Sequence, residues 1–150
     1  MNLQTTIYKQ NTATDSQVLT HLLKCDNDFV QTLSKKVDIP AYSTRIVQNS
    51  ITFEAWEKDE LVGLVAAYFN DQVNKTGFIT NVSTVKDQMG KGIALNLMKR
   101  CIEYAEENNF RDIGLEVSAE NENAIQLYKK FNFIQSAIKD DLIIMKLNLN

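Results

Sequence analysis

The stretch that decides the fold is Lys86-Asp87-Gln88-Met89-Gly90-Lys91-Gly92-Ile93-Ala94. It joins a strand, predicted over Gly77 to Val85 from alternating side chains, to a helix predicted over Lys91 to Asn109, where apolar residues recur at helical spacing. Free backbone amides at the start of a helix carry a partial positive charge, and the two glycines leave them open to an approaching anion. The stretch therefore indicates an anion site, although a tight turn in which glycine supplies only backbone freedom fits the glycines equally well.

Two known nucleotide-binding loops do not fit this stretch. A Walker loop needs four residues between its glycines and then Lys-Ser or Lys-Thr, whereas the chain has Gly90-Lys91-Gly92-Ile93. The dinucleotide fingerprint needs a third glycine, where Leu95 stands, and an acidic residue at the end of the next strand, whereas Asp112 begins that strand. We therefore exclude both loops.

Toward the N-terminus, the pattern predicts two helices and a β-hairpin. The first helix is predicted over Asp15 to Cys25, with its first residue as N-cap and its apolar residues on one face. The second is predicted over Pro40 to about Asn49, because proline fits the first turn of a helix. Strands are predicted over Thr52 to Glu57 and Leu61 to Phe69, and the loop between them is short enough for a hairpin.

Beyond the central helix, the pattern predicts one more strand, one more helix and a closing hairpin. The strand covers Ile113 to Val117 and the helix Ala124 to Phe131. The hairpin pairs Phe133 to Ile138 with Leu142 to Leu149. This order of elements predicts an α+β fold, with a mixed, largely antiparallel central sheet flanked by helices.

The composition favours one domain over residues 1–150 and excludes several functions. The mass of 17.1 kDa fits a single domain, and a hydrophobic content of 44% can fill its core. A net charge of −3 without a cluster of Lys and Arg disfavours nucleic-acid binding. The longest uncharged apolar stretch, Leu61 to Phe69, is far shorter than the about 20 residues of a membrane span. Since Met1 to Thr6 lack the features of a signal peptide, we expect a cytoplasmic protein.

The cysteines and the histidine form no metal-ligand pattern, so no metal site is predicted. Cys25 and Cys101 lie far apart in the sequence, and we expect two reduced thiols, with Cys101 buried. His21 lies in a helical pattern without a second ligand nearby. We therefore expect it on the surface of its helix.

The glycine stretch resembles the signature of the GNAT superfamily of N-acetyltransferases, Gln/Arg-x-x-Gly-x-Gly/Ala, which follows a strand and opens a long helix. Gly90, Gly92 and Ala94 match this signature. Met89 replaces the usual polar first residue, and Gln88 lies one position early, which could weaken one pyrophosphate contact.

A second motif strengthens the resemblance. Leu115-Glu116-Val117, followed by Asn121-x-x-Ala124-x-x-Leu127-Tyr128-x-x-x-x-Phe133, is similar to the family's Leu-Glu-Val…Asn-x-x-Ala-x-x-Leu-Tyr-x-x-x-Gly-Phe pattern. Asn132 stands where the family usually has glycine, and Asn tolerates the left-handed conformation that ends a helix. The resemblance runs from about Leu61 to Phe133, and two motifs at the expected separation are more specific than either alone.

The resemblance implies a splayed V in the sheet that holds acetyl-CoA as cofactor. Its pantetheine arm would pair with backbone near Val82 and Thr84, and its pyrophosphate would lie on the amides of Gly90 to Ala94. The implied cofactor-binding residues are Val82, Thr84, Met89, Gly90, Lys91, Gly92, Ile93, Ala94, Asn121 and Tyr128.

Acetyl transfer to an amine requires a neutral nitrogen and a proton for the departing thiolate. Similar enzymes place a tyrosine hydroxyl at the coenzyme A sulfur, so the resemblance implies that Tyr128 is the general acid. Glu116 is the predicted base, because it points away from its apolar neighbours and lies before Tyr128 at a spacing also found in ribosomal-protein N-terminal acetyltransferases. Water that delivers the proton to solvent stays open as an alternative base.

The acceptor is expected between the N-terminal helices and the third strand. Asp71 is the only acid among the candidates there, whereas a basic peptide would require several carboxylates. We therefore predict a small-molecule amine, with an amino-sugar as the leading candidate, and a monomer or homodimer. The predicted acceptor-binding residues are Tyr42, Arg45, Tyr68, Asn70, Asp71, Asn81 and Ser83.

Three other functions stay open. A protein N-terminal or antibiotic N-acetyltransferase would use the same catalytic pair. A non-catalytic acyl-CoA sensor is favoured by Met89 and disfavoured by Tyr128. A purely structural partner domain could use the apolar strand Leu142 to Leu149 as a dimer edge.

Overall fold

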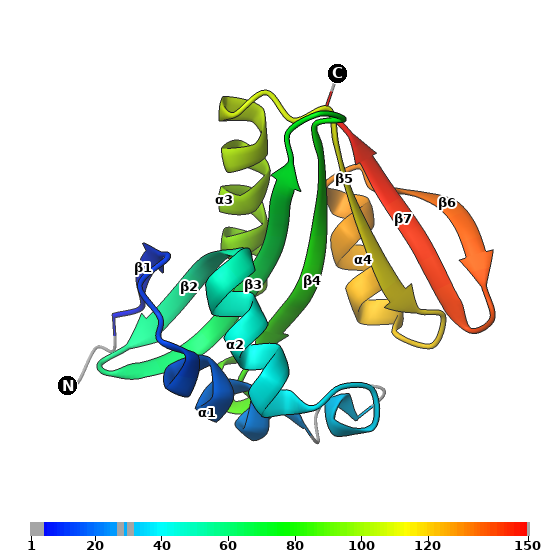
Figure 1. Ribbon diagram of the computed structural model, residues 1–150. Helices are drawn as coiled ribbons and strands as arrows, with labels where there is room; N and C mark the ends of the chain where they lie inside the picture. The colour runs from blue at the N-terminus through cyan, green and yellow to red at the C-terminus, as the bar shows by residue number, and fades with distance from the viewer. Residues whose placement is uncertain (1–4, 27–28, 30–31, 150) are drawn as a thin grey trace.

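The computed structural model describes residues 5–26, 29 and 32–149 of the chain. It contains a seven-stranded sheet in the order β1-β2-β3-β4-β5-β7-β6, with helices on both faces (Figure 1). The strands are β1 (Ile7–Gln10), β2 (Ile51–Glu57), β3 (Glu60–Asp71), β4 (Thr76–Thr84), β5 (Asp112–Ser118), β6 (Ile134–Lys139) and β7 (Leu142–Asn148). The α-helices are α1 (Asp15–Cys25), α2 (Ile39–Asn49), α3 (Ile93–Glu107) and α4 (Glu122–Lys130), with 3-10 turns at Leu33–Lys35 and Lys86–Gln88. The predicted α+β class with a largely antiparallel sheet is confirmed.

Two hydrophobic clusters attach the helices to the sheet. Helices α1 and α2 pack through Val18, Leu22 and Ile46 on one face. Helices α3 and α4 pack on the other, where Leu97 and Tyr128 belong to the larger cluster (Figure 1). Burial of these apolar side chains, each worth about 1.5–3 kcal/mol, fixes the helices against the strands.

The N-cap of α1 differs from the prediction. Thr14, not Asp15, caps the helix: its side chain accepts a hydrogen bond from Gln17 N, and the Gln17 side chain accepts one from Thr14 N. This reciprocal capping box satisfies two backbone donors at once, which a single aspartate side chain at the next position could not do. Asp15 lies in the first turn, where its charge suits the helix dipole.

Strand β1 was not predicted, because four residues with little alternation give no strand signal of their own. It pairs antiparallel with β2, from Ile7 opposite Trp56 to Gln10 opposite Phe53. The partner strand, rather than local pattern, therefore forms this edge.

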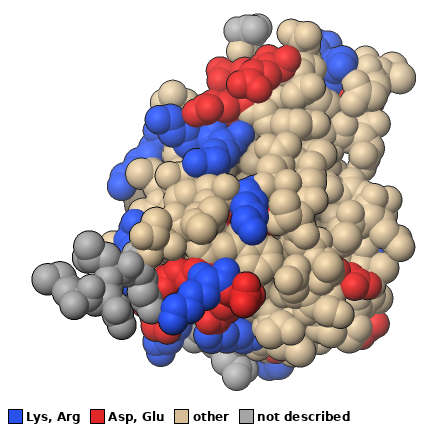
Figure 2. All heavy atoms as spheres, turned by 90° about the vertical axis from the view of Figure 1, so that its left-hand side faces the viewer, with Lys and Arg blue, Asp and Glu red and all other residues tan. Residues whose placement is uncertain are grey.

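On the face that Figure 2 shows, Lys and Arg are mixed with Asp and Glu over a largely uncharged surface.

The sheet opens between β4 and β5. These strands pair in parallel only where Thr76–Ile79 lies opposite Asp112–Leu115. Beyond these pairs the two strands diverge (Figure 1). A β-bulge at Thr80 precedes the divergence, since Ala66 pairs with Asn81 and Ala67 with Ile79. The splayed V that the sequence resemblance implies is therefore present, and it leaves one backbone edge of β4 from Thr80 onward without a strand partner.

A close contact between β3 and α3 sets where the glycine loop lies. Gly63 faces the first turn of α3, and a Cβ at this position would lie 2.5 Å from Ile93 Cγ2 and 3.3 Å from Leu97 Cδ1. Only glycine permits this approach, which brings the start of α3 against the sheet.

The proposed dimer edge is wrong. Strand β7, which covers most of Leu142 to Leu149, lies between β5 and β6, so both of its edges are paired. Strand β6 forms that border of the sheet instead. Hairpin partners can be predicted from sequence, but which of the two strands joins the sheet depends on packing against β5.

The thiols are buried, as predicted for Cys101, and Cys25 is buried as well. Burial raises the pKa of the Cys101 thiol, which keeps it protonated. Among the residues that the structure describes, none of the helices has the length and apolar character needed to span a bilayer.

Candidate functional site

Three hollows, the central, the loop and the outer hollow, meet at the open end of the V. The central hollow, of about 150 Å³, lies between the diverging strands and is lined by Phe29, Leu33, Lys36, Thr80, Asn81, Val82, Glu116, Val117, Ser118, Asn121 and Tyr128. The loop hollow, of about 420 Å³, shares Val82 with it. The outer hollow, of about 520 Å³, shares Thr80 and Glu116 with it. The three hollows are therefore neighbours, with the central hollow between the other two.

The central hollow brings the two predicted catalytic residues together. Tyr128 reaches it from α4 and Glu116 from β5. Tyr128 is only 6% exposed, its ring packs against Phe133 at 6.0 Å between centroids, and its hydroxyl has no hydrogen-bond partner among the described residues. Burial raises the pKa of Tyr128 to about 12, so the hydroxyl stays protonated at neutral pH.

Glu116 is the opposite case, an exposed carboxylate. Its neighbours Leu115 and Val117 point into the core, so the alternation of β5 turns Glu116 to the other face, where it borders both the central and the outer hollow. Among the described residues it makes no ion pair. A protonated phenol and a free carboxylate thus line one cavity.

The loop hollow is built from β4, the glycine loop, the first turn of α3 and helix α4. Gly90 and Gly92 have φ of +82° and +79°, and a Cβ at either position would meet no atom within 4 Å. Gly92 is the N-cap of α3 and carries no side chain to cover the first amides of the helix. The loop thus leaves the backbone amides at the start of α3 uncovered, and it leaves space beside them for an anion. The residues that line this hollow include the predicted Val82, Thr84, Met89, Gly90, Gly92, Ile93 and Ala94.

Two of the predicted cofactor-binding residues, Lys91 and Asn121, do not line the loop hollow. Lys91 does not line the loop hollow, and its Nζ donates a hydrogen bond to Gln88 Oε1 at 3.0 Å. Asn121 lines the central hollow, where its side chain caps α4 by accepting a hydrogen bond from Ala124 N at 3.2 Å. Lys130, which was not predicted, lines the loop hollow from the last turn of α4.

The predicted acceptor residues separate into two groups. Tyr42 lines the outer hollow, Asn81 the central hollow and Ser83 the loop hollow. The other four line none of the three. They are Arg45, whose guanidinium lies 5.6 Å from the Tyr42 ring; Tyr68 of β3, which pairs with Phe78 of β4; Asn70, which donates to Asn49 O; and Asp71, which accepts from Asn74 in the turn after β3.

The outer hollow contains side chains that sequence reasoning missed. Its walls are largely apolar, with Leu33, Val37, Phe78 and Leu142 around Tyr42. Lys36 also borders it and makes no ion pair among the described residues. Lys36 follows a 3-10 turn whose position depends on packing, so the sequence carries no signal for it.

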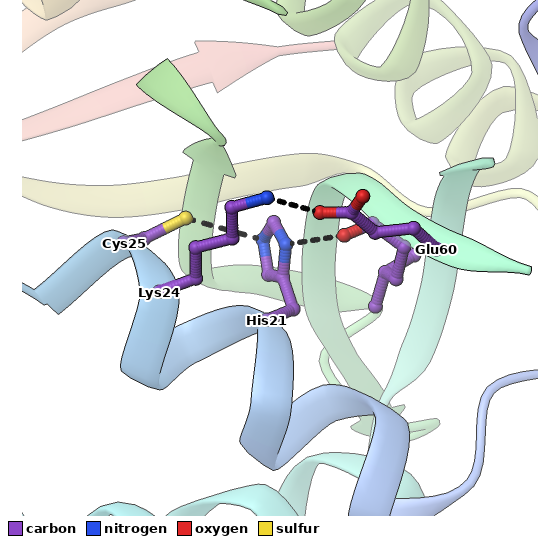
Figure 3. A network of polar contacts seen from close by, with 5 residues as sticks. His21, Lys24, Cys25 and Glu60 are labelled. Atoms are coloured by element: carbon purple, nitrogen blue, oxygen red, sulfur yellow. Dashed lines mark hydrogen bonds and ion pairs between the residues drawn. The ribbon is translucent and has the colours of Figure 1, made fainter. Parts of the chain in front are cut away.

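His21 is buried rather than on the surface of its helix. It is 2% exposed; its Nδ1 lies 2.9 Å from Leu61 O and its Nε2 2.8 Å from Ser83 Oγ. Figure 3 shows the ring between Cys25 and the carbonyl of β3, beside the ion pair of Lys24 and Glu60. Burial is the main cause that lowers the pKa of His21 from 6.5 to about 4. The helical period was compatible with either face, and only the sheet shows which face is covered.

No group of three or more His, Cys, Asp or Glu side chains suited to a metal ion occurs within residues 5–26, 29 and 32–149.

A model of the Acetyltransferase (GNAT) family matches residues 17–133. The curated protein N-alpha-acetyltransferase MAK3 of Arabidopsis thaliana is 29% identical over 87 residues, which are 57% of this chain and 46% of that protein. Uncharacterized N-acetyltransferase YsnE of Bacillus subtilis (strain 168) is 36% identical over 86 residues, which are 55% of this chain and 56% of that protein. The chain thus spans about half the length of these curated relatives.

Solved structures share the fold. An acetyltransferase of the GNAT family from Staphylococcus aureus Mu50 superposes with a TM-score of 0.79 at 16% identity, over 97% of this chain and 100% of that one. An acetyltransferase from Bacillus anthracis str. Ames, in complex with acetyl coenzyme A, gives a TM-score of 0.60 at 21% identity, over 68% of this chain and 64% of that one. At these identities the comparison establishes the fold, and it agrees with the predicted architecture.

Proposed function

Because the chain belongs to the Acetyltransferase (GNAT) family, we propose that it is an N-acetyltransferase that moves an acetyl group from acetyl-CoA to the primary amine of a small molecule. The observation that carries this proposal is the central hollow, which Tyr128 and Glu116 both line and which lies between the loop hollow and the outer hollow. A donor that enters from one side and an acceptor that enters from the other would meet there.

The residues present fit acetyl-CoA. The unpaired edge of β4 near Val82 and Thr84 offers backbone hydrogen bonds to an amide-containing arm. Gly90 and Gly92 leave the amides at the start of α3 open to a pyrophosphate. Acetyl-CoA supplies an activated acetyl thioester when bound. Met89, which replaces the usual polar residue of the signature, is half exposed at the rim of the loop hollow, so it leaves the backbone cradle intact.

The two catalytic residues would handle two protons. Tyr128 Oη carries a proton at neutral pH, as a phenol with its ordinary pKa of 10.0 also would, so it can donate to the departing sulfur. Glu116 is an exposed carboxylate that can take a proton from the acceptor ammonium, directly or through water. The exposed carboxylate accepts and the buried phenol donates, which matches the order of proton transfer that the reaction requires.

The lining of the acceptor side favours a small molecule. Among the described residues, Glu116 is the only carboxylate that lines the outer and central hollows, whereas a basic peptide tail would require several. Lys36 adds one positive charge, which suits an acceptor with an anionic group. The walls formed by Leu33, Phe78 and Leu142 suit an acceptor with an apolar portion. An amino-sugar stays a prediction, and an amine with apolar and anionic groups is supported by these side chains.

The test combines binding and turnover. Acetyl-CoA should raise the Tm of the protein, and release of free thiol should identify the acceptor among amino-sugars, amino acids, polyamines and N-terminal peptides. Tyr128→Phe should lower kcat by about 100-fold while the Kd for acetyl-CoA stays constant. A kcat within about threefold of wild type, with chemistry rate-limiting, would sink the acid assignment. Binding without turnover of any amine would indicate the acyl-CoA sensor instead.

A further inference from the structure

Two side chains of opposite charge, Lys36 and Glu116, border the same two hollows. Lys36 directly follows the 3-10 turn Leu33–Lys35, and Glu116 belongs to β5. Both line the central hollow, and both line the outer hollow. Within the described part of the chain they are the only charged side chains that line these hollows, and neither makes an ion pair. One positive and one negative charge therefore face a shared space.

The small size of the central hollow limits the distance between the charged groups of a bound acceptor. Its volume is about 150 Å³, and Tyr128 lines it together with both charges. The proposed reaction requires the acceptor amine in this hollow, beside Glu116 and Tyr128. Because Lys36 borders the hollow as well, an anionic group only a few bonds from the amine can reach the Lys36 ammonium without leaving it.

The balance of charge favours a carboxylate over a phosphate as the anionic group. One ammonium and one carboxylate on the acceptor match Glu116 and Lys36 one for one. A phosphate monoester carries about −1.5 to −2 charges at neutral pH, of which Lys36 offsets one. The remaining negative charge would lie beside Glu116 and repel it. The two side chains therefore suit a zwitterion with a single negative charge.

The outer hollow offers a larger, mostly apolar space beside these charges. Its volume is about 520 Å³, and Leu33, Val37 and Leu142 belong to its walls. Phe78 also lines it and is 38% exposed, so one aromatic ring is left uncovered there. An apolar group that covers this ring removes apolar surface from water, which favours binding. The outer hollow therefore suits an apolar side chain attached next to the two charged groups.

We propose that the acceptor is a free α-amino acid with an apolar side chain, and that Lys36 is the specificity residue that binds its carboxylate. The amine lies beside Glu116 in the central hollow, the carboxylate contacts the Lys36 ammonium, and the side chain enters the outer hollow. This inference rests on the proposed function and names its substrate class. It departs from the amino-sugar prediction, because a neutral sugar has no group for Lys36.

The transfer itself is balanced by the groups already named. The new C–N bond of the amide replaces the C–S bond of the thioester. The amine gives one proton to Glu116 or water, and the departing sulfur takes one from Tyr128, so the products are an N-acetyl amino acid and coenzyme A. The product keeps its carboxylate but has lost the ammonium, so its attraction to Glu116 is lost and its release is favoured.

The first test compares L-leucine with L-leucinamide, in which a neutral amide replaces the carboxylate. The carboxylate preference is the kcat/KM for L-leucine divided by that for L-leucinamide, measured by thiol release from acetyl-CoA. Lys36→Gln should lower this preference at least about tenfold, the size of a charge-assisted hydrogen bond. The different basicity of the two amines cancels when wild type and variant are compared. An unchanged preference, or an equal loss of kcat/KM for both acceptors, refutes the role of Lys36.

Lys35→Gln is the matched control for the loss of charge. Lys35 is the preceding residue, is exposed like Lys36 and lines neither the central nor the outer hollow. Its substitution removes the same charge from the same segment, so the carboxylate preference should stay within about twofold of wild type. A loss as large as that of Lys36→Gln shows a general effect of charge and refutes direct contact with the carboxylate.

The second test measures binding without turnover. L-leucine is titrated by calorimetry into the protein saturated with coenzyme A, and Lys36→Gln should raise its Kd at least about tenfold. Glycine, which lacks the apolar side chain, should bind at least about tenfold more weakly than L-leucine to the wild type. An equal Kd for glycine refutes the place of the side chain in the outer hollow, and an equal Kd for the variant refutes the carboxylate contact.

The outcomes separate this inference from the proposed function. Acetylation of amino-sugars, polyamines or N-terminal peptides but of no free α-amino acid refutes the inference and leaves the proposed function standing. Failure to acetylate any amine refutes the proposed function instead. In that case the titration still decides whether Lys36 binds the carboxylate of an α-amino acid.

Discussion

His21 makes the stability of the protein depend on pH above the range in which carboxylates titrate. Its pKa is 6.5 in an ordinary environment and about 4 in the folded chain, because burial disfavours the charged ring. The unfolded chain therefore takes up a proton below pH 6.5, whereas the folded chain does not until about pH 4. Stability is complete above pH 6.5 and falls as the pH decreases toward 4.

The size of the effect follows from the two pKa values. Each unit of difference corresponds to about 1.4 kcal/mol, so the free energy of unfolding should fall by roughly 2 kcal/mol between pH 7 and 5 and by roughly 3 kcal/mol at pH 4. Glu54, the buried carboxylate of β2, contributes only at lower pH. Burial raises its pKa, but hydrogen bonds from Thr12, Thr52, Ala13 and Trp56 outweigh burial and lower it. Its stabilisation is therefore lost below about pH 4.5.

Urea unfolding at pH 7, 6 and 5 measures this dependence, with His21→Gln as the matched control. Glutamine does not titrate, and its amide can still donate to Leu61 O and accept from Ser83, so its curve should be nearly flat over this range. Because the chain has one histidine, the difference in slope belongs to this residue alone. Parallel curves for the wild type and His21→Gln would refute the buried, neutral histidine.

Three further substitutions test the framework of the site. Glu54→Gln should destabilise the protein by about 3 kcal/mol at pH 7 in urea unfolding, because its NH2 group would face either the backbone donors of Thr12 and Ala13 or the indole N–H of Trp56; a loss below about 0.5 kcal/mol contradicts the buried network. Gly63→Val should lower stability by about 1–3 kcal/mol, since its Cβ would overlap Ile93, and an unchanged Tm contradicts the packing of α3 on β3. Gly92→Val should weaken acetyl-CoA binding at least tenfold, as measured by calorimetry. The φ of +79° strains a β-branched residue, and the valine side chain would enter the loop hollow. Equal affinity in a folded variant contradicts the phosphate site.

The sequence by itself determined the order of most elements, and it singled out two residues, Glu116 and Tyr128, that line the central hollow. Helix α1 ends at Cys25 as predicted and begins one residue before the predicted start, and the long strands begin and end within two residues of the predicted ones. Local periodicity suffices for these elements because their apolar residues repeat over several turns or several alternations. Glu116 and Tyr128, which the family resemblance implied as the catalytic pair, both border the central hollow, and their catalytic roles stay a prediction.

Only the tertiary structure decided which faces are covered and which distant residues meet. Periodicity identifies a face of a helix but not what packs against it, so His21 was expected in solvent and lies instead against β3 and β4. Asn70 and Asp71 lie at the end of β3, where Asn70 donates to Asn49 O at the end of α2 and Asp71 accepts from Asn74 in the following turn, so neither lines a hollow. Lys36 and Thr80 border the site because the segment before α2 crosses the open end of the sheet and a bulge turns β4. These contacts join residues tens of positions apart, and their energies depend on burial and geometry that no local pattern of residues encodes.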